Sequence, residues 1–277
     1  MNLIVQGKDV ETGALKELAK LARAREIAQV APNVFRLADG QSVPEVGLLC
    51  DQAGLDCAYV PETRRLSDFR LLVMDMDSTL ITIETIDELA DLVGLKKEVA
   101  AITEQAMRGE IEYNASLERR VALLQGLSKE ALSQVYEERV KLTPGADQLL
   151  AQAQAVGIKT LLVSGGFTYV TDRLKVRLQL DYTRSNCLEI TDGKLTGRVI
   201  GTIVNADVKR DALIEVRDAL GCDREQIIGI GDGANDLKFM AECGVSIAYH
   251  AKPIVRGQTT HALNHVDLKG VLPLFNA

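Results

Sequence analysis

The stretch Phe69-Arg70-Leu71-Leu72-Val73-Met74-Asp75-Met76-Asp77-Ser78-Thr79 decides the fold of this chain. Its apolar first half predicts a short buried strand, and that strand ends directly in two acidic residues. Asp75 and Asp77 would each raise the pKa of the other unless a cation or fixed donors lie between them. The pair therefore indicates a functional site at the end of a strand. The alternative is a plain strand end at which one Asp caps the next helix.

The same pattern, an apolar run followed by small polar residues, recurs twice downstream. Ser164-Gly165-Gly166 follows Thr160–Val163, and Gly231-Asp232-Gly233-Ala234-Asn235-Asp236 follows Ile227–Ile230. Strands that alternate with helical segments are therefore predicted over about 69–74, 159–163, 226–230 and 245–248. This alternation predicts an α/β fold with a parallel sheet and helices on both faces. Because such sheets bind ligands beyond the carboxyl ends of their strands, we expect the three motifs to share one site.

Residues 1–66 are predicted to form a separate small α+β module. Strand-like and helical patterns follow one another in the order β-α-β-β-α-β, with a hairpin that turns at Pro32-Asn33. By analogy, this order predicts a ferredoxin-like or ACT-like module. ACT modules often bind amino acids, but a docking or dimerisation module without a ligand is the favoured interpretation.

The segment 83–142 has helical periodicity and many charges, and it is too long for a simple crossover between two strands. We expect it to be an inserted helical cap over the site, so that residues 67–82 and 143–277 form the catalytic core. Within the core, Asp192-Gly193 lies between two alternating runs and predicts a hairpin over about 186–204.

Charge and composition exclude several classes of function. The chain has 32 Lys and Arg against 39 Asp and Glu in 277 residues, a formal net charge of −7. This balance argues against a nucleic-acid partner, which calls for a basic face. No run is long enough to span a bilayer and the N-terminus has no basic leader, so no membrane contact and a cytoplasmic location are expected. The five cysteines form no C-x-x-C pair and are expected to be reduced thiols. The oligomeric state stays open, a homodimer included.

Taken in chain order, the motifs resemble those of the haloacid-dehalogenase-like phosphatases. They are Asp-x-Asp at Asp75, Ser164, Lys209, and Gly-Asp-Gly-x-Asn-Asp at 231–236. The resemblance covers about residues 70–270. Asp75-Met76-Asp77-Ser78-Thr79-Leu80, with Glu84-Thr85-Ile86-Asp87-Glu88 behind it, is similar to the members that act on phosphoserine. The resemblance implies a Rossmann-like core, Mg²⁺ as cofactor, and hydrolysis of O-phospho-L-serine to L-serine and phosphate, the last step of serine biosynthesis.

Hydrolysis of a phosphate monoester needs a nucleophile, an acid and neutralisation of charge. Asp75 is the expected nucleophile, forming an aspartyl-phosphate, and Asp77 is the expected acid and base. Mg²⁺ prefers carboxylates together with substrate phosphate. The expected ligands are the Asp75 carboxylate, Asp232 and, by resemblance, the Asp77 backbone carbonyl. Asp236 is a weaker candidate, which would instead orient its loop or hydrogen-bond Lys209.

The phosphate is expected to be bound by the Ser164 hydroxyl and by the backbone N–H groups of Gly165 and Gly166, since glycine allows close approach. A single lysine is usually a solvated charge. Lys209 is therefore singled out only because the resemblance implies a phosphate-neutralising lysine at this position, and Arg210 is its obvious rival.

The substrate pocket, too, follows from the resemblance. Glu84 and Arg120 match the positions that hold the amine and the carboxylate of phosphoserine, and Arg suits a carboxylate. Met107 and Tyr113 match an apolar patch that closes over the substrate, while Asn235 would touch it from the core side. Without the resemblance, Glu84 would be interpreted as a helix N-terminal acid and Arg120 as a surface charge.

Two other functions stay open at this point. The first is hydrolysis of another small phosphomonoester, such as phosphoethanolamine, against which Glu84 and Arg120 argue. The second is a phospho-accepting or amino-acid-sensing protein without turnover. Asp77 and Lys209 argue against the second, because a switch gains nothing from an efficient leaving-group acid.

Overall fold

The computed structural model describes residues 1–276. The chain divides into two compact units. The first comprises Met1–Leu72, Pro144–Lys159 and the chain from Cys222 onward, and the second comprises Val73–Thr143 and Thr160–Gly221. The domain boundaries expected from the sequence stay a prediction. Within residues 1–276, no helix combines the length and apolar character needed to cross a membrane.

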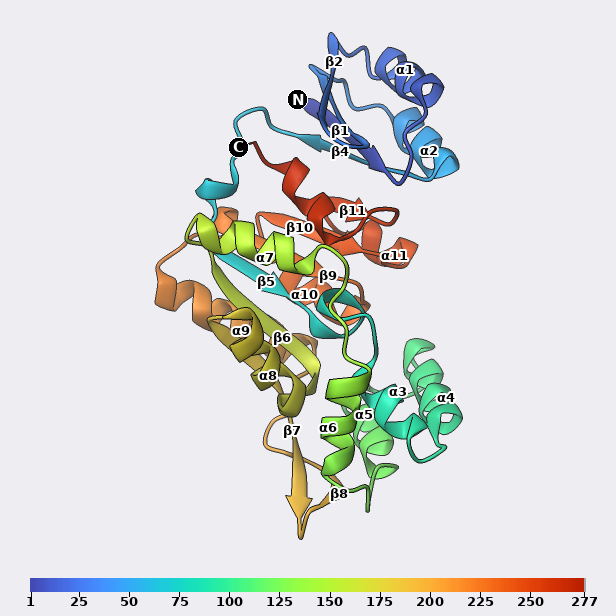
Figure 1. The fold of residues 1–277 in the computed structure, drawn as a ribbon, viewed down its shortest axis with the longest axis vertical. Coiled ribbons are helices and arrows are strands. Elements are labelled where there is room, and N and C mark those ends of the chain that lie inside the picture. Colours follow the sequence, from blue (N-terminus) through green and yellow to red (C-terminus); the bar gives the residue numbers. More distant parts are fainter. Residues whose placement is uncertain (277) are drawn as a thin grey trace. The chain divides into compact units, whose positions relative to one another are not determined.

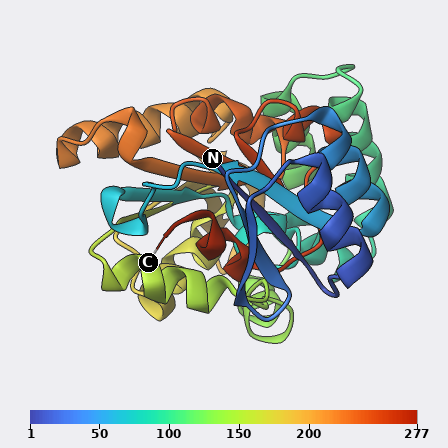
Figure 2. The same cartoon turned by 90° about the horizontal axis from the view of Figure 1, so that it is seen from above.

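The N-terminal part of the first unit has the predicted β-α-β-β-α-β order. Its sheet is antiparallel with the strand order β2-β3-β1-β4, and α1 and α2 lie side by side on one face of it (Figures 1 and 2). The hairpin turns at Asn33, which has φ 56° and belongs to the residue types that tolerate this conformation. The elements are β1 (Asn2–Gly7), α1 (Thr12–Leu21), β2 (Glu26–Ala31), β3 (Val34–Ala38), α2 (Pro44–Ala53) and β4 (Leu55–Val60).

The two faces of this small sheet are buried differently. Leu3, Val5 and Leu37 pack with the two helices in an apolar core. On the opposite face, Gln6 Nε2 donates to the Gly270 carbonyl at 2.8 Å. The Asp56 carboxylate accepts backbone N–H groups from residues 264, 265 and 266 at 2.7, 2.9 and 3.1 Å. The C-terminal segment therefore covers the β1–β4 side of this face.

The other strands of the first unit, β9 (Ile227–Gly231), β10 (Val245–Tyr249) and β11 (His261–Leu263), are parallel. Strands β9 and β10 are buried along their whole length, as expected for a sheet covered on both faces. Three helices accompany them, α7 (Ala146–Ala155), α10 (Leu237–Met240) and α11 (Pro253–Arg256).

In the second unit, β6 (Lys159–Phe167) pairs in parallel with β7 (Tyr182–Thr191), and β7 forms the predicted hairpin with β8 (Lys194–Ile200). Together with β5 (Leu71–Met74), the strands follow the order β11-β10-β9-β5-β6-β7-β8 in one sheet, and only the β7–β8 pairing is antiparallel among those described. The expected α/β fold with a large parallel sheet is confirmed. Helices α8 (Thr168–Leu178) and α9 (Ala206–Leu220) complete this part.

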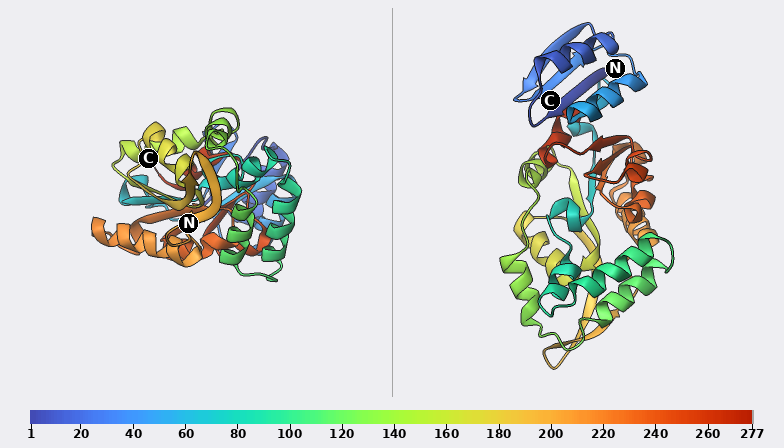
Figure 3. Two further views of the ribbon diagram at one scale, coloured as in Figure 1. Left: turned by 90° about the horizontal axis from the view of Figure 1, so that it is seen from below. Right: turned by 90° about the vertical axis from the view of Figure 1, so that its right-hand side faces the viewer.

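The segment predicted to be a cap is helical. Its helices are α3 (Thr85–Asp91), α4 (Lys96–Met107), α5 (Tyr113–Ala122) and α6 (Glu130–Glu138), which cluster together in Figure 3. Leu89, Leu117 and Val135 belong to an apolar core that also contains Phe167 from β6 and Leu195 from β8. Shared burial with the strands of the same unit holds the four helices in place.

Candidate active site

The Asp75 motif continues strand β5 beyond its last residue. All four residues of β5 are buried, and Asp75 and Asp77 keep extended backbone conformations before Ser78 turns the chain with φ 56°. Met76 between them is completely buried, and the positive charge of one lysine, Lys209, acts on both acids: it bonds Asp75 Oδ1 and opposes the rise in the pKa of Asp77. The strand therefore presents two carboxyl groups together at its end.

Helix α9 brings a lysine to the first of these carboxylates. The Asn205 side chain caps this helix by accepting the N–H groups of Asp207 and Val208, both at 3.1 Å, which places Lys209 in the first turn. Lys209 Nζ donates to Asp75 Oδ1 at 2.8 Å, and Lys209 and Asp75 are 0% and 6% exposed. The pair is thus almost fully buried.

Arg210, the rival of Lys209, does not share this environment. It is half-buried, and its guanidinium forms ion pairs with Asp207 at 3.3 Å and with Asp211 at 2.8 Å on its own helix. The structure therefore places the lysine, and not the arginine, against Asp75.

The second carboxyl group is held by the start of helix α3. The Thr85 hydroxyl donates to the Asp77 carboxyl group, and Thr85 Oγ1 lies 2.7 Å from Asp77 Oδ1 and 2.8 Å from Oδ2. The Thr85 backbone N–H also donates to Asp77 Oδ1, at 3.3 Å. Desolvation, followed by the negative charge of Glu84, raises the pKa of Asp77 to about 8. A carboxyl group with this pKa holds a proton near neutral pH and suits a general acid. Sequence reasoning missed Thr85, although its place at a helix start was a signal for a donor.

The last part of β6, where the register against β7 shifts between Val163 and Phe167, contains a buried serine and two glycines, Ser164-Gly165-Gly166, which we call the glycine loop. Ser164 is 1% exposed, and its hydroxyl accepts the Gly166 N–H at 2.8 Å. A Cβ atom at Gly166 would lie 2.8 Å from Asp77 Oδ2 and 3.0 Å from Thr85 Oγ1. Only glycine leaves room here for the Asp77 carboxyl group.

Asn186 on strand β7 is a second residue that sequence reasoning missed. Its Nδ2 donates to the Gly165 carbonyl at 2.7 Å, and its Oδ1 accepts the Val204 N–H at 2.9 Å. The side chain is 1% exposed. It therefore fixes the glycine loop to the segment that leads into α9.

The cap residues lie in the second unit with Asp75 and Asp77. Glu84 accepts a hydrogen bond from the Ser78 hydroxyl at 2.7 Å. Its pKa is raised, chiefly because the surrounding protein desolvates its carboxylate, and the positive charge of Arg120 opposes this shift. Arg120 is half-buried on α5, whereas its neighbour Arg119 is exposed. The two residues thus interact through their charges.

Tyr113 and Met107 occupy different surroundings. Tyr113 begins α5, and a Cβ atom at Gly165 would collide with its hydroxyl, so the tyrosine lies directly over the glycine loop. Met107, at the end of α4, is 61% exposed.

The motif at 231–236 lies in the first unit, at the end of β9. The buried Asp236 carboxylate accepts the Gly233 N–H at 3.0 Å, and a Cβ atom at Gly231 would lie 2.6 Å from Asp236 Oδ2. Asp236 therefore orients this loop. Asp232 and Asn235 are both half-buried on it.

Comparison with known proteins gives the family. The model of the haloacid dehalogenase-like hydrolases matches residues 69–244, and a domain of unknown function, DUF4072, matches residues 3–46. The chain belongs to the haloacid dehalogenase-like hydrolase family, as its motifs predicted.

Individual relatives are more specific. The phosphoserine phosphatase of Polaromonas sp. is 54% identical over 215 residues, which are 76% of this chain and 91% of the relative. The crystal structure of a probable phosphoserine phosphatase from Vibrio cholerae is similar with a TM-score of 0.85 and 38% identity, covering 99% of this chain and 85% of that one. A HAD family hydrolase from Salmonella enterica has a TM-score of 0.89 and 33% identity, with 99% and 98% of the two chains covered.

Proposed function

We propose that this chain is a Mg²⁺-dependent phosphatase that hydrolyses O-phospho-L-serine to L-serine and phosphate. The observation that carries the chemistry is the buried contact of 2.8 Å between Lys209 Nζ and Asp75 Oδ1, beside a carboxyl group, Asp77, with a pKa of about 8. The similarity to phosphoserine phosphatases supports the substrate.

In this proposal Asp75 attacks the phosphorus atom and forms an aspartyl-phosphate. Lys209 neutralises negative charge that would otherwise repel the substrate phosphate. Asp77 gives its proton to the serine oxygen as it leaves, and then accepts a proton from the water that hydrolyses the intermediate. The Thr85 hydrogen bonds fix the orientation of Asp77 for both steps. The Ser164 hydroxyl and the N–H groups of the glycine loop would bind the phosphate oxygens.

The residues fit a divalent cation. Asp75, Asp232 and Asp236 each offer a carboxylate oxygen, the kind of ligand that Mg²⁺ prefers. We propose Asp75, Asp232 and the backbone carbonyl of Asp77 as ligands, with Asp236 as loop-orienting residue. When bound, Mg²⁺ would offset the repulsion between an anionic nucleophile and an anionic phosphate.

Recognition of the serine part would fall to Glu84 and Arg120. The carboxylate of Glu84 suits an ammonium group, and the guanidinium of Arg120 suits a carboxylate, which it can bind through two parallel hydrogen bonds. Tyr113, which lies over the glycine loop, would help exclude water. Contacts of Met107 and Asn235 with the substrate, a cytoplasmic location and a homodimer stay predictions.

The test is phosphate release in the presence of Mg²⁺ from L-phosphoserine, L-phosphothreonine, phosphoethanolamine and 3-phosphoglycerate, with Asp75→Asn as blank. We expect a clear preference for phosphoserine. A preference for another compound would support the proposed catalytic chemistry but contradict the recognition roles assigned to Glu84 and Arg120. Release from none of them would contradict the enzymatic proposal and favour a switch or sensor.

A matched pair of variants separates recognition from catalysis. Arg120→Ala should damage hydrolysis of phosphoserine far more than hydrolysis of an aryl phosphate that lacks a carboxylate. Arg119→Ala removes the same charge from the exposed neighbouring position and should leave both activities unchanged. Equal loss on both substrates in Arg120→Ala would show that Arg120 does not determine specificity.

A further inference from the structure

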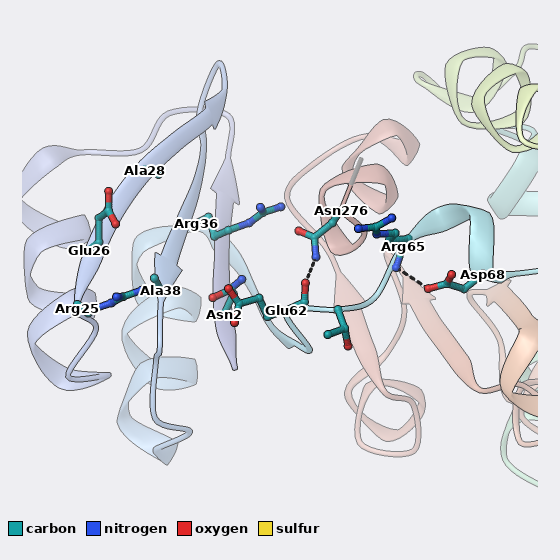
Figure 4. Close-up of a pocket in the computed structure, with 11 residues that line it drawn as sticks. Asn2, Arg25, Glu26, Ala28, Arg36, Ala38, Glu62, Arg65, Asp68 and Asn276 are labelled. Carbon is teal, nitrogen blue, oxygen red and sulfur yellow. Dashed lines mark hydrogen bonds between the residues drawn. The ribbon is translucent and has the colours of Figure 1, made fainter.

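A cavity of about 780 Å³ lies in the first unit, and none of its lining residues belongs to the candidate active site. One wall is the open face of the N-terminal sheet, with Ala28, Arg36 and Ala38. The other wall is the segment that follows β4, with Arg65, together with Asn276 (Figure 4). A volume of this size is typical of a site for a small molecule.

The cavity exists because the C-terminal segment covers only part of that face. Strand register places Arg36 between Ile4 on β1 and Ala28 on β2. Ile4 is completely buried, whereas every residue of β2 is exposed. The sheet is thus covered over β1 and β4 and open over β2 and β3, and the small side chains of Ala28 and Ala38 leave the space unfilled.

Arg36 is the unusual residue of this face. Its Nε is buried and has no hydrogen-bond partner among the described residues. Buried donors are nearly always paired with protein, water or ligand, so this one indicates a partner that enters the cavity. Another lining arginine, Arg25, is by contrast paired with Asp39 at 2.9 Å.

Arg65 lies across the cavity from Arg36. Its backbone N–H donates to the Asp68 carboxylate at 3.0 Å, and the adjacent Asn276 is tied to the carbonyl of Glu62 by its side-chain amide. These bonds fix the wall that carries Arg65. In Figure 4 the Arg36 guanidinium extends from the sheet toward this wall.

We propose that the cavity is a second ligand site, which binds a small molecule through a single carboxylate or phosphate group held between the guanidinium groups of Arg36 and Arg65. A guanidinium presents a planar fork of donors that matches both kinds of oxyanion. In a chain with a net charge of −7, such an anion has to be held by local donors. Glu26 and Glu62 also line the cavity, so ligands with several negative charges, such as a nucleoside triphosphate, are disfavoured. This site does not depend on the proposed function.

The test follows the Arg36 side chain itself by NMR. The Nε–H signal of Arg36 is assigned in the full chain by its loss in Arg36→Lys. The wild type is then titrated with inorganic phosphate and, separately, with succinate, against chloride at matched ionic strength. We expect a saturable shift of the Arg36 signal with at least one of the two oxyanions. A shift with phosphate alone or with succinate alone identifies the group that the site prefers.

Two variants locate the site. Arg65→Ala should weaken the oxyanion affinity by about tenfold or more. Lys16→Ala should leave it unchanged, because it removes one positive charge from an exposed position on α1, which covers the opposite face of the sheet. Arg65 is exposed, so its loss should not unfold the chain. The proposal is overturned if neither oxyanion shifts the Arg36 signal beyond the chloride control, or if Arg65→Ala binds as tightly as the wild type.

Discussion

Lys209 Nζ lies 2.8 Å from Asp75 Oδ1, and both side chains are almost fully shielded from solvent. The two opposite charges stabilise each other in a buried place, so the loss of either one is costly. The contact links helix α9 to the end of strand β5. It thereby joins two sequence motifs, 134 residues apart, in one candidate catalytic group.

Replacing Lys209 with Met should therefore reduce both activity and stability. We expect kcat/KM to fall by about 100-fold or more, since Lys209 is proposed to neutralise negative charge at the substrate phosphate. We also expect a loss of about 3–5 kcal/mol in the free energy of unfolding, because Asp75 stays buried without the lysine that compensates its charge. Steady-state kinetics and urea unfolding measure the two effects.

Two further variants control this experiment. Arg210→Met removes the neighbouring cation, which forms ion pairs with Asp207 and Asp211 of its own helix, and should leave kcat/KM unchanged. The double variant Asp75→Asn, Lys209→Met should regain much of the lost stability, though not activity, because both opposite charges of the buried pair are then removed together. Equal activities of Lys209→Met and Arg210→Met would refute the assigned role of Lys209.

Gly166 is a second sensitive position. In Gly166→Ala the added Cβ atom would lie 2.8 Å from Asp77 Oδ2 and 2.6 Å from Met76 Cε, so the Asp77 carboxyl group has to move. A displacement of a catalytic group by about 1 Å can cost on the order of 100-fold in rate, and we expect kcat to fall by about 10- to 100-fold. Gly47→Ala serves as control, since a Cβ atom at Gly47 meets nothing within 4 Å. Unchanged kcat in Gly166→Ala would show that Asp77 has more freedom than its contacts indicate.

Much of this site could be predicted from the sequence because its residues follow strands. Asp75 and Ser164 come directly after short apolar runs, and Asp232 comes one residue later. The strands β5, β6 and β9 coincide with most of those runs, although β6 continues through Ser164 to Phe167. The motif order then led to the family. Apolar periodicity and strand-end chemistry are local signals, and a single sequence carries them well.

Thr85 and Asn186 escaped prediction because their roles depend on contacts that the sequence does not encode locally. Thr85 donates to the carboxyl group of Asp77, eight residues earlier in the chain. The turn between them requires the positive φ of Ser78. Asn186 bridges two loops that are far apart in the chain. Lys209 was found only through the family resemblance, since nothing in its neighbourhood distinguishes a buried lysine from a solvated one.

Asp56 should be important for the stability of the first unit. Its buried carboxylate accepts three backbone N–H groups, from Asn264, His265 and Val266. Asp56→Ala would leave these donors without their acceptor. Since an unsatisfied buried donor costs about 1–3 kcal/mol, we expect a loss of about 3 kcal/mol in the free energy of unfolding, measured in urea.

The control is Asp51→Ala, which removes an exposed acid of α2 and should change the free energy of unfolding by less than about 0.5 kcal/mol. A similar effect of both variants would contradict the assigned role of Asp56.

His261 should make the stability of the chain depend on pH. Its ring is 8% exposed and Nε2 lies 2.9 Å from Arg64 Nη1, so in this contact the arginine donates to a neutral imidazole. Burial, and then the charge of Arg64, lowers the pKa of His261 from 6.5 to about 4. Between these two values the unfolded chain binds more protons than the folded chain, so the free energy of unfolding falls as the pH falls from 6.5 toward 4.

Between pH 7 and pH 5 this group should cost the wild type about 2 kcal/mol of stability, measured by urea unfolding at the two pH values. His261→Gln keeps an acceptor for Arg64 but has no titrating ring, so its loss between pH 7 and pH 5 should be smaller by about this amount. His250→Asn removes an exposed imidazole and should behave like the wild type. If His261→Gln loses as much stability as the wild type, a different group governs the acid sensitivity, and the neutral His261–Arg64 contact is not its source.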